Sequence, residues 1–252
     1  MLAVDVVSAP ESPAPSLLAD LTEFGQTVEC LAGADAVVHL AAIPAPGIHT
    51  EETTFRTNML STYNVFEAAR LQGLSRVVWA SSETILGLPF DRELPAYAPI
   101  DEEHPPYPES SYALSKVLSE ELGRQLHRWT GTPHVALRFS NIMEPGDYER
   151  FPSYWDDPQV RRWNLWGYVD DRDVAQSCRL ALDAGTGAEH FIVAAADTVM
   201  NRPSRELMAE VYPSVEYRRT AGDFGTLLSI DKARRLLGYE PQWSWRDHIA
   251  DA

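Results

Sequence analysis

Two residues with complementary chemistry, Tyr112 and Lys116, stand four positions apart in the stretch "SSYALSK". Positions i and i+4 of a helix lie on one face, so a helix here would place the phenol beside the amine. A nearby ammonium group favours the phenolate form of a tyrosine, whose ordinary pKa is about 10. The pair suits general acid–base catalysis, with Tyr112 exchanging the proton. The spacing also arises by chance, so this interpretation needs support from the rest of the chain.

A serine at the end of a predicted strand supplies a third chemical group. The apolar segment 75–82 ends at Ser82, and open α/β sheets bind ligands at the carboxyl ends of their strands. A serine hydroxyl at that edge can donate a hydrogen bond to a substrate oxygen. The alternative is that Ser82 only caps the following turn. Together with Tyr112 and Lys116, it would form a site that moves a hydride to or from a carbonyl carbon.

The segments that must position these residues alternate between strand and helix patterns. Continuous apolar runs, typical of strands covered on both faces, occur at residues 2–7, 34–42, 75–82, 134–140 and 189–195. Helical patterns lie at residues 52–71, 110–130, 171–184, 203–211 and 226–237. This alternation predicts an α/β fold with a doubly wound, mostly parallel sheet of Rossmann type. Residues 8–16 are interpreted as a loop, and residues 143–166 as an irregular connection.

Composition limits the classes of partner. The formal charge is −16, with 21 Lys and Arg against 37 Asp and Glu, and nucleic-acid binding needs a cationic surface. No apolar run reaches the length of about 18 residues that a membrane span needs, and no secretory signal is visible at the start. Cys30 and Cys178 lie far apart and the histidines are not clustered, so neither a disulfide framework nor a metal site is expected. We expect a cytoplasmic protein with a small-molecule substrate.

The Gly-rich turn that usually follows the first strand of a dinucleotide-binding sheet is absent. The first glycine is Gly25, and the only Gly-x-Gly, at 185–187, precedes a predicted strand and is therefore interpreted as a turn. A strand, this turn and a helix, about 25–30 residues, would be expected ahead of Leu2. Their loss would leave a gap in the sheet. Either the chain was cut short or it is a naturally reduced relative; we favour a truncated enzyme.

Seven stretches resemble one family in that family's order. They are "HLAA" (39–42), "NMLSTYNVFEAA" (58–69), "SSETILG" (81–87), "YALSK" (112–116), "LRFSNIMEPG" (137–146), "YVDDRDVA" (168–175) and "DKARRLLGYEPQWSW" (231–245). The chain resembles the extended short-chain dehydrogenase/reductases, the NAD-dependent epimerase/dehydratase family, from its second strand onward. This resemblance implies a dinucleotide-binding core over 1–142. It also implies a region at 143–252 that completes the sheet and forms a small substrate-binding part.

The resemblance implies roles for individual residues. The catalytic residues would be Ser82, Tyr112 and Lys116. The residues expected to bind the cofactor are Asp5, Asp20, Leu21, Leu40, Ala41, Ala42, Asn58, Tyr112, Lys116, Phe139, Asn141 and Ile142. A carboxylate at Asp5 would repel a 2′-phosphate, which favours NAD over NADP. The residues expected to contact the substrate are Glu83, Thr84, Asn141 and Arg161. A homodimer is expected by resemblance only.

Several details bear on the reaction. Family dehydratases carry an Asp-Glu pair after the catalytic hydroxyl, whereas here Glu83 is followed by Thr84, which disfavours dehydration. The compact C-terminal part and the stretch 153–155, "SYW", are similar to uronate dehydrogenases. Arg161 and Arg162 could clamp an anionic group or form surface ion pairs. The run "RRWNLWGY" fits core packing or an aromatic sugar platform.

Three functions follow from these observations. The first is an NAD-dependent oxidoreductase acting on a secondary alcohol or ketone of a sugar or uronate. The second is a sugar or nucleotide-sugar epimerase that uses the same residues and retains its cofactor. The third is a non-catalytic binding or scaffold protein that keeps the fold without the phosphate loop.

Overall fold

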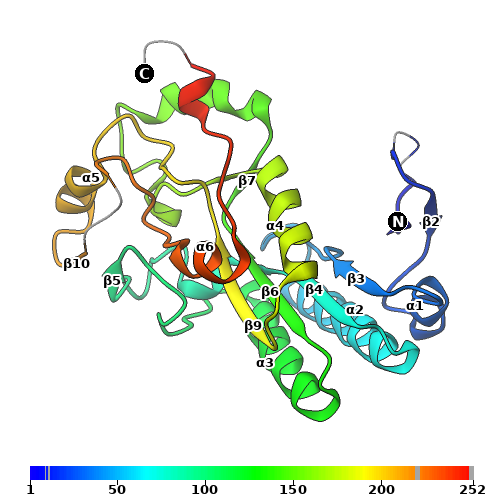
Figure 1. The fold of residues 1–252 in the computed structure, drawn as a ribbon. Helices are drawn as coiled ribbons and strands as arrows, with labels where there is room; N and C mark the ends of the chain where they lie inside the picture. The colour runs from blue at the N-terminus through cyan, green and yellow to red at the C-terminus, as the bar shows by residue number, and fades with distance from the viewer. Residues whose placement is uncertain (9, 11, 219–221, 250–252) are drawn as a thin grey trace. The chain divides into compact units, whose positions relative to one another are not determined.

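The computed structural model describes residues 1–8, 10, 12–218 and 222–249 (Figure 1). The chain divides into two compact units, each assembled from separated segments. The first unit contains residues 1–80, 110–136 and 186–189, and the second contains residues 81–109, 137–185 and 190–252. Strands β4 (Arg76–Ser82) and β6 (His134–Phe139) begin in the first unit and end in the second.

The first unit contains the helices and strands that carry Tyr112 and Lys116. Its complete elements are β1 (Ala3–Asp5), β2 (Ser16–Leu18), α1 (Phe24–Cys30), β3 (Ala36–His39), α2 (Glu51–Gln72) and α3 (Ser111–Thr130). Helices α2 and α3 pack along each other (Figure 1). Both end at a glycine in the left-handed conformation, Gly73 with φ 69° and Gly131 with φ 76°, which a residue without Cβ adopts at little cost.

The strands of the first unit belong to two sheets. β1 and β2 pair in parallel with each other, and β3 pairs in parallel with β4. β6 lies on the other side of β4, where Val77 N donates to the carbonyl of Pro133. β3 is therefore an edge of its sheet, and β1 is not hydrogen-bonded to it. The sheet is interrupted, as the sequence predicts.

The core of the first unit forms where α2 and α3 cover these strands. Phe66 and Trp79 are almost fully buried and meet edge to face, with ring centroids 5.7 Å apart. Val77, Leu126 and Ala136 belong to the same apolar cluster. This packing fixes the helix that carries the candidate catalytic pair against the strand that ends at the candidate serine.

The second unit combines short strands with irregular segments. Its strands are β5 (Tyr97–Ala98), β7 (Ile142–Met143), β8 (Val169–Asp170), β9 (Glu189–Val193) and β10 (Glu216–Tyr217), of which β9 starts at the end of the first unit. Its α-helices are α4 (Asp171–Asp183), α5 (Ser204–Val211) and α6 (Asp231–Leu237). Its 3-10 helices are Glu83–Leu86, Pro145–Tyr154, Arg162–Asn164 and Trp245–Asp247. β9 pairs with β6, and the pairs β7–β8 and β5–β10 are parallel.

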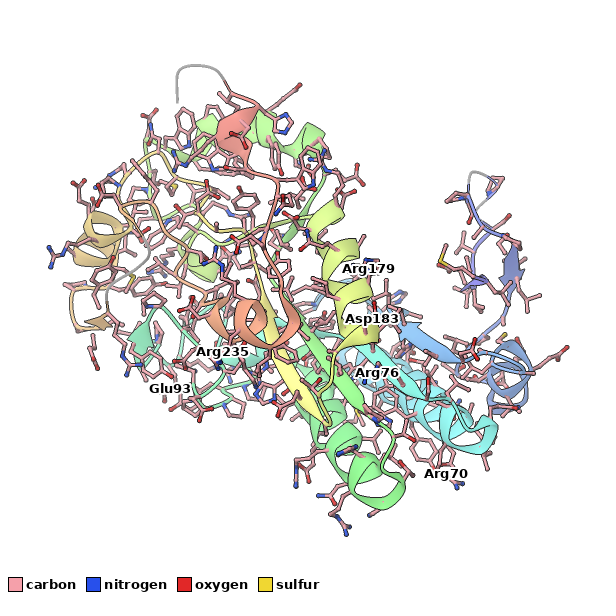
Figure 2. All side chains as sticks on the ribbon, in the orientation of Figure 1. Arg70, Arg76, Glu93, Arg179, Asp183 and Arg235 are labelled. Atoms are coloured by element: carbon pink, nitrogen blue, oxygen red, sulfur yellow. The ribbon has the colours of Figure 1, made fainter. Side chains whose placement is uncertain are left out.

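An aromatic core fixes the irregular segments of the second unit. Tyr148, Phe151, Tyr168 and Trp245 are at most 1% exposed and form a chain of tilted and edge-to-face contacts. The outer face of α4 carries the ion pair Arg179–Asp183, whose side chains are both solvent-exposed (Figure 2). None of the helices in the described part of the chain has the length and apolar character that a membrane crossing requires.

Most predicted elements are present, and the differences have local causes. All five predicted strands form, although β1 keeps only three residues. The helix predicted over 226–237 begins only at Asp231, because the residues before it form hydrogen bonds and bridges to Ile100 and to residues 196–197. Helix α1 and strand β2 were not predicted. Both are short, and their sequences, "FGQTVEC" and "SLL", give no periodic pattern long enough to interpret.

Candidate active site

Helix α3 brings Tyr112 and Lys116 together. Ser110 caps the helix by accepting a hydrogen bond from Ala113 N at 3.1 Å, so Tyr112 lies in the first turn and Lys116 one turn later. The two side chains are 7% and 5% exposed. Lys116 Nζ lies 5.6 Å from the centroid of the Tyr112 ring. The phenol and the amine therefore share one face of the helix, as the spacing predicts.

Lys116 is held by the backbone of β4. Its Nζ donates to the carbonyl oxygen of Ala80 at 2.7 Å, and burial lowers its pKa to about 8. The neighbouring His39 is buried with Nε2 3.2 Å from Thr62 Oγ1. Burial, and secondarily the charge of Lys116, lowers the pKa of His39 to about 3. His39 is therefore neutral at physiological pH, whereas Lys116 is a cation beside the Tyr112 ring.

Ser82 is the last residue of β4, two positions after Ala80. Its Oγ accepts hydrogen bonds from Thr84 N at 3.2 Å and from Thr84 Oγ1 at 3.0 Å, and it caps the 3-10 helix that follows. The capping interpretation is therefore confirmed. It does not compete with a catalytic role, because a hydroxyl group has one donor hydrogen besides its two acceptor positions. The hydroxyl hydrogen of Ser82 remains available to a substrate oxygen.

The segment after β3 is fixed by Asn58 of α2. Asn58 Oδ1 accepts from Ile43 N at 2.8 Å and its Nδ2 donates to Ile43 O at 3.1 Å, so the amide replaces a backbone partner. The residues just before, Leu40 and Ala41, are exposed, with Leu40 54% exposed, and Ala42 is half-buried. An exposed backbone that is fixed at Ile43 fits the cofactor-lining role that the resemblance implies for residues 40–42.

The other residues predicted to bind cofactor in the first unit lie around β1 and β2. Asp5 ends β1, is exposed, and accepts from Val7 N at 3.0 Å. Asp20 accepts from both Thr22 N and Thr22 Oγ1, and these hydrogen bonds lower the pKa of its carboxyl. Leu21 is half-buried and its carbonyl accepts from Asn64 Nδ2 at 2.9 Å. Asp20 thus stabilises a turn, while Asp5 keeps a solvent-facing carboxylate.

The second unit contains a buried polar group of side chains that we call the Glu83–Arg161 cluster: Glu83, Asn141, Arg161 and Asn164. Arg161 Nη2 donates to Asn141 Oδ1 at 3.0 Å and to the carbonyl of Gly167 at 3.2 Å. Asn164 Nδ2 donates to the same carbonyl at 2.8 Å and to Glu83 Oε1 at 3.3 Å. Three of the four predicted substrate residues therefore meet here, and the fourth, Thr84, is half-buried beside Glu83 in the chain.

Opposite charges face each other inside the cluster. Glu83 is 3% exposed, and burial raises its pKa to about 7 although the Ser140 hydroxyl, two amides and the charge of Arg161 favour its charged form. Burial also lowers the pKa of Arg161. The guanidinium carbon of Arg161 lies 4.8 Å from the Trp163 ring centroid and 5.5 Å from that of Tyr154. The guanidinium of Arg161 is therefore buried and lies against two aromatic rings.

Arg161 and Arg162 differ in exposure and in their partners. Arg162, next in the chain, has a side chain 44% exposed and lies 3.8 Å from the carboxylate of Asp91. The surface ion pair considered for both arginines thus applies to Arg162, while Arg161 points into the protein.

Two further residues predicted to bind cofactor lie on strands of the second unit. Phe139 ends β6 and is 7% exposed, and Ile142 lies on β7 with 46% exposure.

The loop that carries Arg161 and Asn164 has an unusual backbone. Leu165 and Trp166 have φ angles of 53° and 56°, which non-glycine residues adopt rarely and at a cost. A Cβ at Gly167 would lie 2.9 Å from Ser140 Oγ and 2.8 Å from Leu228 Cδ1, so this position requires glycine. Asn164 was not predicted as a site residue. Its only sequence signal is a polar side chain inside the aromatic run "RRWNLWGY".

Comparisons with known proteins identify the family of the chain. The profile of the NAD dependent epimerase/dehydratase family matches residues 6–194. L-arabinose 1-dehydrogenase (NAD(P)(+)) of Haloferax volcanii is 28% identical over 176 residues, 67% of this chain and 68% of that protein. UDP-glucose 4-epimerase of Lacticaseibacillus casei is 26% identical over 86% of this chain and 75% of its own length. Uronate dehydrogenase of Agrobacterium fabrum is 31% identical over 54% of this chain and 49% of its own length.

Solved structures show the same fold. A mutated uronate dehydrogenase superposes with a TM-score of 0.69 at 23% identity, covering 98% of this chain and 75% of that one. A short-chain dehydrogenase/reductase superfamily protein from Agrobacterium tumefaciens, solved with bound NAD, gives a TM-score of 0.72 at 22% identity over 97% of this chain and 85% of its own. The predicted doubly wound α/β fold is confirmed. The expectation of NAD as cofactor agrees with the family and with that neighbour.

Proposed function

Because the chain belongs to the NAD dependent epimerase/dehydratase family, we propose that it is an NAD-dependent dehydrogenase of a sugar or sugar acid. The reaction moves a hydride between the cofactor and a hydroxyl-bearing carbon of the substrate. The relatives named L-arabinose 1-dehydrogenase and uronate dehydrogenase support this substrate class. The observation that carries the proposal is the buried pairing of Tyr112 with Lys116 on α3.

The proton is exchanged by Tyr112. A phenol with an ordinary pKa of about 10 is a poor base near neutral pH, so its anionic form needs stabilisation. Lys116 supplies a positive charge within 5.6 Å of the ring and is kept in place by the carbonyl of Ala80. As the substrate hydroxyl is oxidised, its proton passes to the Tyr112 oxygen. The neutral His39 takes no proton in this scheme.

Ser82 orients the substrate oxygen in this proposal. Its hydroxyl accepts from Thr84 and donates its remaining hydrogen to the oxygen of the reacting carbon. Bound NAD would supply the acceptor for the hydride that leaves that carbon. The residues that would hold the cofactor are Asp5, Asp20, Leu21, Leu40, Ala41, Ala42, Asn58, Tyr112, Lys116, Phe139, Asn141 and Ile142. The division into a cofactor core at 1–142 and a substrate part at 143–252 belongs to the same proposal.

The substrate's anionic or hydroxyl-rich end is bound by Arg161 in this proposal. Guanidinium groups bind carboxylates through two parallel hydrogen bonds, and Arg161 is fixed by Asn141 and by the carbonyl of Gly167. The flanking rings of Tyr154 and Trp163 add apolar faces of the kind that pack against sugars. Glu83 and Thr84 complete the set of proposed substrate contacts.

The second candidate is a sugar or nucleotide-sugar epimerase. The match to UDP-glucose 4-epimerase extends over 86% of this chain, more than the match to the sugar dehydrogenases, and this favours it. Such an enzyme would oxidise and then reduce the same carbon and would release no NADH. The non-catalytic alternative has weaker support, because a scaffold has no physical need for a buried lysine beside a tyrosine.

A substrate panel distinguishes these functions. The purified chain is mixed with NAD and with D-glucuronate, L-arabinose, D-glucose 6-phosphate or UDP-glucose, and NADH is followed by its absorbance. The dehydrogenase proposal predicts NADH formation with D-glucuronate or L-arabinose. Conversion of UDP-glucose to UDP-galactose without net NADH would establish the epimerase. Calorimetry that detects no NAD binding would favour the scaffold.

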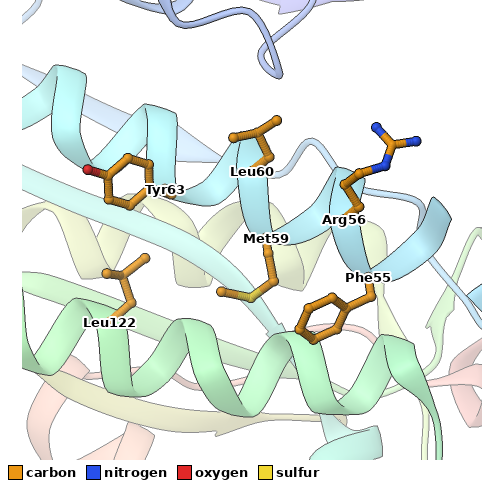
Figure 3. Close-up of a pocket in the computed structure, with 6 residues that line it drawn as sticks. All are labelled: Phe55, Arg56, Met59, Leu60, Tyr63 and Leu122. Carbon is orange, nitrogen blue, oxygen red and sulfur yellow. The ribbon is translucent and has the colours of Figure 1, made fainter. Parts of the chain in front are cut away.

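We further propose a homodimer formed through α2 and α3. These helices expose Leu60, Tyr63, Leu114 and Leu118, each 39–48% accessible, around a depression lined by Phe55, Arg56, Met59, Leu60, Tyr63 and Leu122 (Figure 3). A second copy of this apolar helix pair would cover it, as the resemblance implies. Sedimentation should show a dimer that Leu118→Glu disrupts, whereas Leu236→Glu, at a leucine of similar exposure on α6, should not. A monomeric wild type would contradict this.

A cytoplasmic location completes the proposal. Cys30 and Cys178 are both unpaired thiols, which fits a reducing compartment. The substrate and NAD are small molecules of that compartment, so no further partner is required.

A further inference from the structure

The Glu83–Arg161 cluster has unused hydrogen-bonding capacity of two kinds. Buried polar atoms without a partner among the described residues include Arg161 Nε, Glu83 Oε2, Asn164 Oδ1 and Ser140 Oγ. Arg161 Nε is a donor in need of an acceptor, and Asn164 Oδ1 is an acceptor in need of a donor. Leaving such groups unpaired in a protein interior is costly. A bound anion would accept a hydrogen bond from Arg161 Nε. A proton on Glu83 would supply a donor for an unpaired acceptor oxygen.

The hydrogen bonds already present show where that proton fits. Glu83 Oε1 accepts from Asn164 Nδ2, while Oε2 has no partner that meets hydrogen-bond geometry among the described residues, although the Ser140 hydroxyl and the Asn141 N–H favour the charged carboxylate. A proton on this carboxyl turns Glu83 into a donor for a neighbouring oxygen. The same proton removes the negative charge that balances Arg161. Protonation of Glu83 therefore adds a hydrogen-bond donor to the cluster. It also leaves the Glu83–Arg161 pair with a net positive charge.

The state of Glu83 decides what Arg161 attracts. With Glu83 ionised the pair is neutral, and an incoming carboxylate is repelled by Glu83 as much as it is drawn to Arg161. Among the described residues, the groups that act electrostatically on Arg161 are Glu83 and the Tyr154 hydroxyl, and the charged group that acts on Glu83 is Arg161. Burial places the pKa of Glu83 at about 7, so the change falls within the physiological range.

We propose that Glu83 is a specificity-determining residue that admits the carboxylate of a sugar acid to Arg161 only when Glu83 carries a proton. This rests on the proposed function, since it assigns the acidic end of the substrate to Arg161. It makes the site selective for sugar acids over neutral sugars at low pH and removes that preference at high pH. Binding of a sugar acid then takes up one proton at pH values above the pKa of Glu83.

The first test is the pH dependence of KM from about pH 5.5 to about pH 8.5. For the wild-type chain with NAD, KM for D-glucuronate should be constant at low pH and rise about tenfold per pH unit above pH 7. KM for L-arabinose, which has no carboxylate, should stay level. Glu83→Gln should keep the low KM for D-glucuronate throughout, with kcat changing in parallel with the wild type.

A matched control separates charge in general from Glu83 in particular. Arg162→Gln removes a neighbouring charge that lies outside the cluster, and it should leave the KM profile of D-glucuronate unchanged. A Glu83→Gln profile that still rises above pH 7 would overturn the proposal, and so would a level wild-type profile.

Calorimetry covers the case in which Glu83→Gln does not fold. Titration of D-glucuronate into wild-type protein in two buffers of different ionisation enthalpy measures proton uptake directly. Uptake approaching one proton at about pH 8 supports the proposal, and uptake of none contradicts it. This measurement needs no turnover. A chain that binds D-glucuronate with proton uptake but forms no NADH would refute the dehydrogenase function while supporting the role of Glu83.

Discussion

The two buried ionisable groups Lys116 and Glu83 are held in different ways. Lys116 extends from a regular helix to one backbone carbonyl of a regular strand, and burial is the sole cause that lowers its pKa to about 8. Glu83 is surrounded by side chains from loops, and Arg161 and several amides oppose the effect of burial, yet its pKa still rises to about 7. One group is positioned by backbone, the other by a network of side chains.

The two environments suit Lys116 and Glu83 to different steps of the proposed reaction. A lysine fixed by helix and strand keeps its position whether or not a substrate is bound, so it suits the chemical step. A carboxyl in a network with unpaired atoms can change its protonation and its partners, so it suits recognition. We therefore expect substitutions near Lys116 to change kcat and substitutions near Glu83 to change KM.

The largest effect should come from Tyr112→Phe. Removal of the hydroxyl that exchanges the proton should lower kcat by about 10²–10⁴-fold, the usual contribution of a general acid or base. Binding of NAD, measured by calorimetry, should change little because the ring remains. Tyr107→Phe is the control, since this tyrosine is 36% exposed and lies outside α3. A Tyr112→Phe enzyme that keeps wild-type kcat would assign the proton transfer to another group.

The next largest effect is on stability, and its pH dependence has opposite signs for Glu83 and Lys116. For Glu83 the folded pKa of about 7 exceeds its ordinary value of 4.5, so the folded state binds more protons between these pH values. The free energy of unfolding should therefore fall by about 3 kcal/mol as pH rises through this window. For Lys116 the folded pKa of about 8 lies below 10.5, so the unfolded state binds more protons there. Stability should rise by about 3 kcal/mol between these values.

Urea unfolding as a function of pH measures both contributions. Each is read as the difference between the wild type and one variant, because other groups titrate in the same windows. Glu83→Gln should remove the fall at acidic to neutral pH, and Lys116→Met should remove the rise at alkaline pH. If each variant keeps the full wild-type slope in its own window, the shifted pKa does not belong to that residue.

The contrast also explains how much of the site the sequence could reveal. Tyr112, Lys116 and Ser82 lie on elements with clear signals: a helix with a serine cap, and an apolar strand. Their types and spacing therefore predict their positions along the fold. The fold class follows from the same alternation of patterns, and the resemblance to a family supplies the cofactor.

The Glu83–Arg161 cluster could be predicted only in part. Arg161 and Arg162 are adjacent arginines, yet Arg161 is buried and bonded to Asn141 while Arg162 is exposed beside Asp91, in a loop that turns at Leu165 and Trp166 with positive φ angles. Such a turn in residues other than glycine has no local sequence signal. The role of Asn164 depends on the same turn. The sequence therefore does not indicate the geometry of the cluster, because side chains from distant loops determine it.

The smallest effect tests whether that turn sets the geometry of the cluster. Gly167→Ala adds a Cβ 2.8 Å from Leu228 Cδ1, 2.9 Å from Ser140 Oγ and 3.2 Å from the carbonyl oxygen of Asn164, so neighbouring side chains or the loop backbone must shift. Crowding of this kind should lower the free energy of unfolding by about 1–3 kcal/mol, measured by urea unfolding. Gly146→Ala is the control in the same unit, because a Cβ there meets no atom within 4 Å.

The carbonyl of Gly167 connects this stability change to substrate binding. It accepts hydrogen bonds from both Arg161 Nη2 and Asn164 Nδ2, so a backbone shift moves the groups that flank Glu83 together. Gly167→Ala should therefore also raise KM for D-glucuronate, while kcat, which depends on Tyr112 and Lys116, changes little. If stability falls and KM does not, the crowding is relieved on the side of Leu228, and the position of Arg161 is set by Asn141 and not by the turn.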